Sequence, residues 1–353
     1  MYLSQLILEN FRSYHRRDFE FGPKTNLVLG PNGSGKTNLL EAIYFLSCGK
    51  SFRSSALSQL ICWDKPFTSV RGRITKDSEP AELEVQLIKE PAKISLSRKF
   101  IIDQVATSRP KYLGVLKTVV FEPEDIRLVT GSPNRRREYL DSVFTATQWR
   151  YAQALSQYHR ALKHRNELLD LIRQAKSQRS ELFYWDQSLI KNANIIHTFR
   201  QNFIKSLNTF FQDHSFSEIQ TLSLNYHPSV LTQEKLEKNY SLDLNLGYTQ
   251  AGIHRDDFSF DNSVFSAADK NLAFWGSRGQ QRLAVLALRL GQINYLEETY
   301  SQKPILLLDD IFSELDPEHR QLVVDICHKY QTIFTSADES VIAILPDSAK
   351  IHL

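Results

Sequence analysis

Eight consecutive residues near the N-terminus have the types and spacing of a phosphate-binding loop. The loop reads Gly30, Pro31, Asn32, Gly33, Ser34, Gly35, Lys36 and Thr37, and it stands between an apolar run at 26–29 and a helix-like stretch at 38–46. This is the P-loop pattern, G-x-x-x-x-G-K-[ST]. Its glycines let backbone N–H groups turn inward at a helix N-terminus, where the helix dipole favours anions. We expect the loop to hold ATP, with Lys36 reaching the β- and γ-phosphates and Thr37 binding Mg²⁺.

A second candidate lies far along the chain, where the apolar stretch 305–308 ends in Asp309 and Asp310. This pattern predicts a buried parallel strand whose C-terminal end presents Asp309 to the same magnesium ion. Asp310 then stands where a carboxylate could polarise an attacking water, so Lys36 and Asp310 are the predicted catalytic residues. The sequence Ser-Glu-Leu-Asp at 313–316 follows at once.

A third candidate, just before a strongly apolar helix at 283–290, comprises Ser277, Arg278, Gly279 and Gln280. A serine and a glycine at a helix N-terminus predict a second anion-binding site. Within one copy this site has no evident substrate. If two copies meet head to tail, each can close on the γ-phosphate held by the other, which predicts a homodimer that forms on ATP.

The surrounding elements divide the chain into a head and an insertion. Period-two alternation predicts strands at 3–9, 17–21 and 25–29, followed by an antiparallel group at 69–75, 81–89 and 93–100. Beyond Pro123 the pattern turns helical, and two amphipathic helices, the second over 184–211, predict an antiparallel hairpin. Strand-like alternation returns at 223, and 332–335 is the last predicted strand. We expect a head of residues 1–121 and 247–353 and a mainly helical lobe of residues 122–246.

Charge is distributed unevenly in this chain of 353 residues, although its net charge is only +3. Residues 134–182 hold ten Lys and Arg against five Asp and Glu, whereas residues 297–347 hold three against eleven. A solvated helix face explains such a run equally well. The alternative is a track for DNA phosphates, for which the candidates are Arg135, Arg136, Arg137, Lys163 and Arg165.

Other features narrow the class of protein. The three cysteines form no C-x-x-C pair, and His254 has no second ligand at metal spacing, so the 252–257 loop is interpreted as structural or partner-facing. The N-terminus lacks a signal-peptide pattern, and no apolar stretch approaches the roughly 18–20 residues of a membrane span. We therefore expect a soluble cytoplasmic protein with no membrane contact; association with the nucleoid is expected only if the protein also binds DNA.

The order of these motifs resembles the ABC-type ATPase heads of the SMC group. Further strings at 10–14, 121–125, 131–141, 252–257 and 306–316 extend the likeness over the whole chain, to the RecF family of bacterial recombination mediators. The resemblance implies an α/β fold: an ABC-type P-loop ATPase head, made of a mixed sheet plus an antiparallel β subdomain, with a helical insertion lobe. It also implies a weak, DNA-stimulated ATPase that dimerises on ATP and binds double-stranded DNA near gaps or junctions. By the same resemblance, Arg12 is a candidate for contact with phosphate or DNA. RecO and RecR are the implied partners in loading RecA.

Three departures from the wider ABC pattern bear on chemistry. Arg278 replaces a glycine of Ser-Gly-Gly-Gln, and Asp310 replaces the glutamate that usually follows the strand. Because about 1 Å of misplacement can cost about 100-fold in rate, the shorter Asp310 predicts slow hydrolysis. Thr335, Ser336, Ala337 and Asp338 stand where a switch histidine is expected, so the γ-phosphate sensor and the Q-loop stay unassigned.

Three other functions are alternatives, and each is disfavoured by a feature of the sequence. A transporter ATPase subunit usually carries Asp-Glu after the buried strand, and a small-molecule P-loop kinase does not explain residues 277–280. An architectural SMC protein needs hundreds of coiled-coil residues between its halves, and this chain lacks them.

Overall fold

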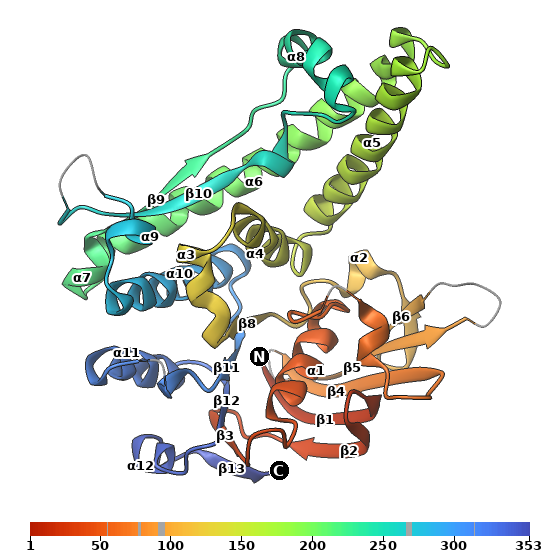
Figure 1. Cartoon of the computed structure of the whole chain (residues 1–353). Helices are drawn as coiled ribbons and strands as arrows, with labels where there is room; N and C mark the ends of the chain where they lie inside the picture. The colour runs from red at the N-terminus through yellow and green to blue at the C-terminus, as the bar shows by residue number, and fades with distance from the viewer. Residues whose placement is uncertain (55, 77–78, 91–95, 266–269, 314) are drawn as a thin grey trace. The chain divides into compact units, whose positions relative to one another are not determined.

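The computed structural model describes residues 1–54, 56–76, 79–90, 96–265, 270–313 and 315–353, and it divides into two compact units (Figure 1). Unit 1 comprises residues 1–125 and 292–353, and unit 2 comprises residues 126–291. The prediction assigned residues 247–291 to the head, whereas in the structure they belong to unit 2. The reason is local: β10 (Asp257–Asn262) pairs with β9 (Leu222–His227) of the insertion, and a Cβ on Gly291 would lie 2.5 Å from Leu207.

A five-stranded parallel sheet forms the centre of unit 1, in the order β13-β3-β12-β11-β8. β3 leads through the glycine-rich loop into α1 (Lys36–Cys48), and α11 (Pro317–Cys327) and α12 (Val341–Ile344) precede β12 and β13 respectively. Because β3, β12 and β11 are neighbours in register, their carboxyl ends meet at one edge of the sheet. The strand bounds are Ala349–His352 (β13), Thr25–Leu29 (β3), Thr332–Ser336 (β12), Ile305–Asp309 (β11) and Thr118–Phe121 (β8). The sequence patterns missed β13.

A six-stranded antiparallel sheet completes unit 1, in the order β2-β1-β4-β5-β6-β7. α1 packs closely on it, since a Cβ on Gly72 of β4 would come within 2.3 Å of Leu46 of α1. Parallel and antiparallel pairings thus occur in separate sheets. The predicted strand 93–100 begins among residues outside the described ranges. The bounds are Tyr14–Glu20 (β2), Tyr2–Phe11 (β1), Phe67–Lys76 (β4), Glu79–Lys89 (β5), Leu96–Ile102 (β6) and Val105–Thr107 (β7), with α2 at Arg109–Tyr112 and 3₁₀ turns at Leu57–Leu60, Pro123–Ile126 and Ile311–Ser313.

Unit 2 is built on the predicted helical hairpin, α5 (Trp149–Arg173) and α6 (Leu182–Asp213), which run side by side (Figure 1). Their buried residues recur every three or four positions, which is the helical period. β9 lies against α6, and its partner β10 contacts α4 and α9. α10 (Arg278–Tyr300) begins in this unit and ends in unit 1. The remaining elements are α3 (Arg127–Thr130), α4 (Pro133–Thr145), α7 (Ser217–Gln220), α8 (Gln233–Leu246), α9 (Leu272–Trp275) and 3₁₀ turns at Arg179–Glu181 and Ile253–Arg255.

Within the described ranges, no helix is long and apolar enough to cross a membrane.

Candidate nucleotide site and basic residues

The loop between β3 and α1 has the backbone of an anion cradle. Gly33 and Gly35 have φ of 85° and 106°, values that side chains with a Cβ rarely adopt. A Cβ on Gly35 would also lie 2.8 Å from the Tyr14 hydroxyl, which donates to the Gly35 carbonyl at 3.1 Å. A Cβ on Gly33 would meet no other described residue within 4 Å apart from its chain neighbours, so the loop is open there. Glycine at 35 is thus required by the fold, whereas glycine at 33 leaves room for a ligand.

Two polar side chains of the loop fit a bound phosphate. Lys36 is buried, and its ammonium donates to the carbonyls of Gly30 and Pro31 at 2.6 and 2.9 Å. The Ser34 hydroxyl is buried with no hydrogen-bond partner. Because an unsatisfied buried hydroxyl is unfavourable, it favours an oxygen-rich ligand at this position.

Thr37 and Asp309, 272 residues apart in sequence, lie in contact. The Thr37 hydroxyl donates to one carboxylate oxygen of Asp309 at 2.8 Å, and the Thr335 hydroxyl donates to the other at 2.7 Å. No cluster of three or more His, Cys, Asp or Glu that could hold a metal exists in the described part of the chain. One carboxylate and one hydroxyl suit Mg²⁺ that is also coordinated by phosphates, because Mg²⁺ rarely occupies an all-protein cage.

Asp310 follows with an unusual backbone. Its φ is 47°, in the left-handed region, where Asp is more common than most residues. Its N–H donates to the Thr335 carbonyl at 3.0 Å, and the Ser336 hydroxyl lies 3.4 Å from its carboxylate. Burial, and then the charge of Asp309, raise the pKa of the Asp310 carboxyl. A carboxylate with a raised pKa is better suited to accept a proton than an ordinary one.

The end of β12 contributes residues whose contacts the sequence did not assign. Thr335 and Ser336 are fully or almost fully buried, and they bond Asp309 and Asp310 respectively. Their strand pairs with both β3 and β11, which places these hydroxyls beside the two carboxylates. The only signal in the sequence was the missing histidine at this place. Of the following Ser-Glu-Leu-Asp string, Glu314 lies outside the described residues.

The predicted second anion site belongs to unit 2 and starts α10. The Ser277 hydroxyl accepts from the Gln280 N–H at 3.2 Å, while the Gln280 side chain accepts from the Ser277 N–H at 2.8 Å. This reciprocal pair is a capping box, so the serine and glutamine spacing has a structural use as well. Ser277 and Arg278 are both exposed. A Cβ on Gly279 would have no neighbour closer than 3.9 Å, so packing within the chain does not require this glycine.

Arg12 is held inside unit 1 by a carboxylate. Its guanidinium donates to both oxygens of Glu41, at 2.8 and 2.7 Å, and its side chain is 18% exposed. Glu41 is fully buried and also accepts from Ser51 at 2.5 Å. The charge of Arg12 is therefore already balanced, which weakens its candidacy for a DNA phosphate.

The structure corrects the predicted track in unit 2 at Arg165. This side chain is 1% exposed and donates to Asp186 at 2.6 Å and Asp243 at 2.8 Å. A buried guanidinium with two carboxylate partners cannot reach a DNA phosphate, and it holds α5, α6 and α8 together instead.

The neighbouring candidates differ in exposure. Arg136 is also removed from the track, since it binds both oxygens of Asp257 and its side chain is 11% exposed. Arg137 donates to the Asp256 carbonyl at 2.9 Å, and Arg135 is half-buried. Lys163 is 76% exposed, with Glu167 at 3.8 Å. Among the predicted basic residues of unit 2, Lys163 is the one that the structure describes as largely exposed.

The loop around His254 is structural. His254 Nε2 donates to the Thr249 carbonyl, and Nδ1 accepts from the Tyr158 hydroxyl at 2.7 Å. Asp256 is fully buried and receives Arg200 and Tyr226. These bonds make the loop a hydrogen-bonded turn, as expected, in which both imidazole nitrogens are occupied.

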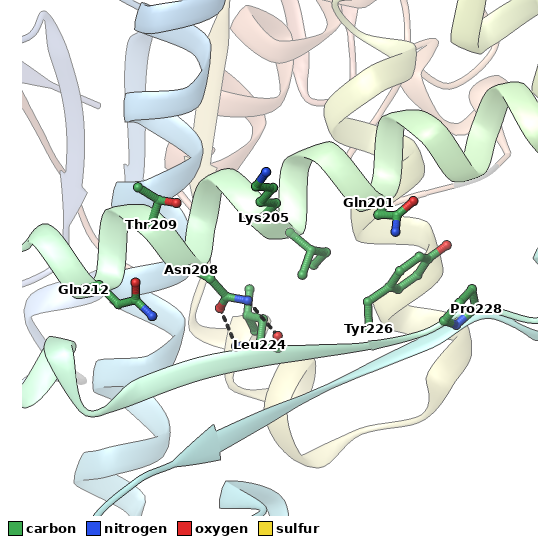
Figure 2. A pocket seen from close by; sticks show the side chains of 9 residues that line it. Gln201, Lys205, Asn208, Thr209, Gln212, Leu224, Tyr226 and Pro228 are labelled. Carbon is green, nitrogen blue, oxygen red and sulfur yellow. Dashed lines mark hydrogen bonds between the residues drawn. The ribbon is translucent and has the colours of Figure 1, made fainter.

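A groove of about 460 Å³ lies between α6 and the β9 segment of unit 2 (Figure 2). Figure 2 shows the Asn208 amide bonded to the backbone of Leu224, with N–O distances of 2.9 and 2.7 Å. The lining is mainly uncharged, with Lys205 its one cation. It contains none of the predicted nucleotide-site residues, which come from the P-loop and the start of α10.

Comparison with known proteins places these features in a family. The family model described as "RecF/RecN/SMC N terminal domain" matches residues 2–349. The chain is 34% identical to the DNA replication and repair protein RecF of Leptospira interrogans, covering 100% of this chain and 97% of that protein. Against the RecF of Bacillus pumilus the identity is also 34%, with coverages of 95% and 93%.

Solved structures agree. The chain resembles a structure titled as the recombination mediator protein RecF with ATPrS in the RecFOR pathway, with a TM-score of 0.85 and 30% identity over 100% of this chain and 96% of that one. A likeness to an Smc head, with a TM-score of 0.51 and 16% identity over 97% and 91% of the two chains, shows the fold alone. The predicted ABC-type ATPase head with a helical lobe is thereby confirmed, and the chain belongs to the RecF family of the SMC group.

Proposed function

We propose that this chain is an ATP-dependent DNA-binding protein of recombinational gap repair and a slow, DNA-stimulated ATPase. ATP binding brings two copies together on DNA, at junctions of single and double strands. Hydrolysis separates them. RecO and RecR are the proposed partners, with which the dimer promotes RecA loading in the cytoplasm, at the nucleoid.

The observation that carries ATP binding is the contact of Thr37 with Asp309 beside an open glycine loop. Lys36 and Ser34 would hold phosphate oxygens, and Thr37 with Asp309 would hold Mg²⁺. The ion would neutralise charge on the phosphates when bound. Similar structures are titled with ATP and with ATPrS, which supports the same ligand here.

Asp310 is proposed as the residue that orients and deprotonates the attacking water. Its raised pKa suits that role, and its contact with Ser336 fixes one carboxylate oxygen. The short side chain, with its backbone held by Thr335, limits its reach. Slow turnover follows from this restraint.

Dimerisation is supported by the start of α10. Ser277 and the exposed Arg278 stand at a capped helix N-terminus, where a phosphate is favoured. Gly279 is a helix-weakening residue in the first turn, and no packing contact requires it, which favours close approach of a ligand. Next to it, Phe274 and Trp275 are 82% and 59% exposed, and a second copy would cover these rings.

DNA binding rests on family membership and on exposed basic residues of α5. Arg160 and Lys163 are both exposed and lie three positions apart, on one helix face. Arg160→Gln with Lys163→Gln should lower the slope of log affinity against log salt by up to about 1.8, two phosphate contacts at about 0.9 each. Lys350→Gln, which removes an exposed charge from β13, is the control and should change nothing. Competition among gapped, duplex and single-stranded DNA then measures the preferred structure.

A mixing experiment tests the two-copy site. Lys36→Met disables the P-loop of a copy, and Ser277→Arg disables its α10 site, so each variant alone should neither dimerise on ATP nor hydrolyse it. A mixed pair contains one intact composite site, because the pair is symmetric. Because neither variant pairs with itself, only mixed pairs form, and one intact site of two should restore up to about half of wild-type ATPase activity in an equimolar mixture. If the mixture is no more active than its components, the nucleotide is not shared between copies.

A further inference from the structure

We propose that Arg98 and Arg109 of unit 1 form a binding site for a phosphate-type oxyanion, separate from the P-loop. Arg98 lies in β6, and Arg109 begins α2. β6 pairs with β7 so that Phe100 faces Thr107. Two residues after β7, α2 packs against β6, where the Phe100 and Tyr112 rings lie 4.9 Å apart. The two guanidinium groups are close enough for the charge of Arg98 to act on Arg109.

Arg109 carries an unused recognition edge. Its Nε and Nη2 atoms are buried and have no hydrogen-bond partner. These two N–H groups are the parallel donors with which arginine binds a carboxylate or phosphate in a bidentate manner. Leaving them unsatisfied is costly, more so than for neutral groups. These two donors therefore favour an oxyanion that the described residues do not supply.

No carboxylate of the described residues bridges to either arginine. Arg98 donates from Nη1 to the Gly49 carbonyl at 2.9 Å, which is a neutral partner. Burial, and then the charge of Arg98, lower the pKa of Arg109, so the two like charges oppose each other. The nearby Cys48 thiol is completely buried, and burial raises its pKa, so it stays neutral and gives no counter-charge. Lys50 adds a third positive charge beside Cys48.

Two half-buried guanidinium groups match the charge and the several oxygens of a phosphate. The source is either the DNA backbone or a free phosphate. If the ligand is a DNA phosphate, the inference rests on the proposed function, because Arg98 and Arg109 would then contact the backbone of the bound DNA. The basic stretch from Lys50 to Arg53, which follows α1 directly, has the same sign of charge.

The first experiment measures thermal unfolding in inorganic phosphate against chloride at equal ionic strength. Wild-type protein should gain about 2–4 °C, saturably, since a ligand of the folded state stabilises it. Arg109→Lys keeps the charge but removes the bidentate edge, and it should lose the gain. Lys99→Gln is the matched control: it removes an exposed charge from the same strand, next to Arg98 but on the opposite face, and it should keep the gain.

The second experiment measures duplex DNA affinity against salt. If a backbone phosphate is the ligand, Arg109→Gln lowers the slope of log affinity against log salt by about 0.9. If the variant and the wild type bind equally at 1 M salt, this change makes the variant about eightfold weaker at 0.1 M salt. Lys99→Gln should leave both unchanged. A phosphate gain without a slope change assigns the site to free phosphate. The proposal is overturned if neither effect depends on Arg109, or if Lys99→Gln acts equally. Should wild-type protein bind no DNA, the proposed function fails, while the phosphate experiment still tests this site.

Discussion

Neighbouring carboxylates with different contacts allow a matched pair of substitutions, Asp309→Asn and Asp310→Asn. Both remove one charge and keep the side-chain size. Asp309 accepts hydrogen bonds from Thr37 and Thr335, whereas among the described residues the Asp310 carboxylate is contacted by Ser336, at 3.4 Å, and by the Ser313 side chain. We expect Asp309→Asn to prevent the ATP-dependent dimer and Asp310→Asn to trap it.

The structure sets the expected magnitudes. An amide at 309 keeps one acceptor oxygen, so one of the two threonine hydroxyls loses its partner, at about 1–3 kcal/mol in the free energy of unfolding. Asp310→Asn removes the like-charge repulsion with Asp309, so the free energy of unfolding should not fall. Loss of a general base lowers the rate by about 100-fold or more, equivalent to about 2.7 kcal/mol in activation free energy.

The assay combines light-scattering mass in ATP·Mg²⁺ and in ADP, phosphate release, and urea unfolding. Wild-type turnover should itself be slow. If Asp310→Asn hydrolyses ATP at the wild-type rate, Asp310 does not activate the water. If Asp309→Asn forms the dimer as readily as wild type, the metal is held elsewhere. Equal effects of both substitutions would refute the division of roles.

Three further predictions concern single residues. Arg165→Ala should lower the free energy of unfolding by about 3–5 kcal/mol, because Asp186 and Asp243 are left without their cation. Arg165→Met should lower it by nearly as much, since it keeps most of the packing but leaves the same two carboxylates unpaired. Urea unfolding measures both variants, and a loss below about 1 kcal/mol, typical of an exposed ion pair, would contradict the burial of Arg165. Burial lowers the pKa of His254 in the folded protein, so this imidazole is protonated more readily in the unfolded chain. The free energy of unfolding should therefore fall as the pH drops below about 6.5, by at most about 1.4 kcal/mol per pH unit. His254→Gln should flatten this pH dependence in unfolding experiments. Gly35→Ala should abolish ATP binding in a fluorescent-nucleotide titration, because φ is 106° and the new Cβ meets the Tyr14 hydroxyl, while Gly33→Ala, where space is open, should retain more.

The sequence alone determined the parts that depend on local pattern. The glycine spacing at 30–37, the apolar run before Asp309 and the three-to-four spacing in α5 and α6 each specify an element through its own periodicity or backbone needs. Motif order along the chain was enough to recognise the ATPase head, because that fold brings distant loops together in a fixed way.

The tertiary structure decided which charges are free. A basic run in the sequence could not separate exposed Lys163 from buried Arg165, since the carboxylates that neutralise Arg165 lie 21 and 78 residues away. For the same reason the contacts of Arg12 with Glu41 and of Thr335 with Asp309 could not be predicted, because they form only when distant elements pack together. Exposure and ion pairing are properties of long-range contacts, and a linear pattern records only which residues could make them.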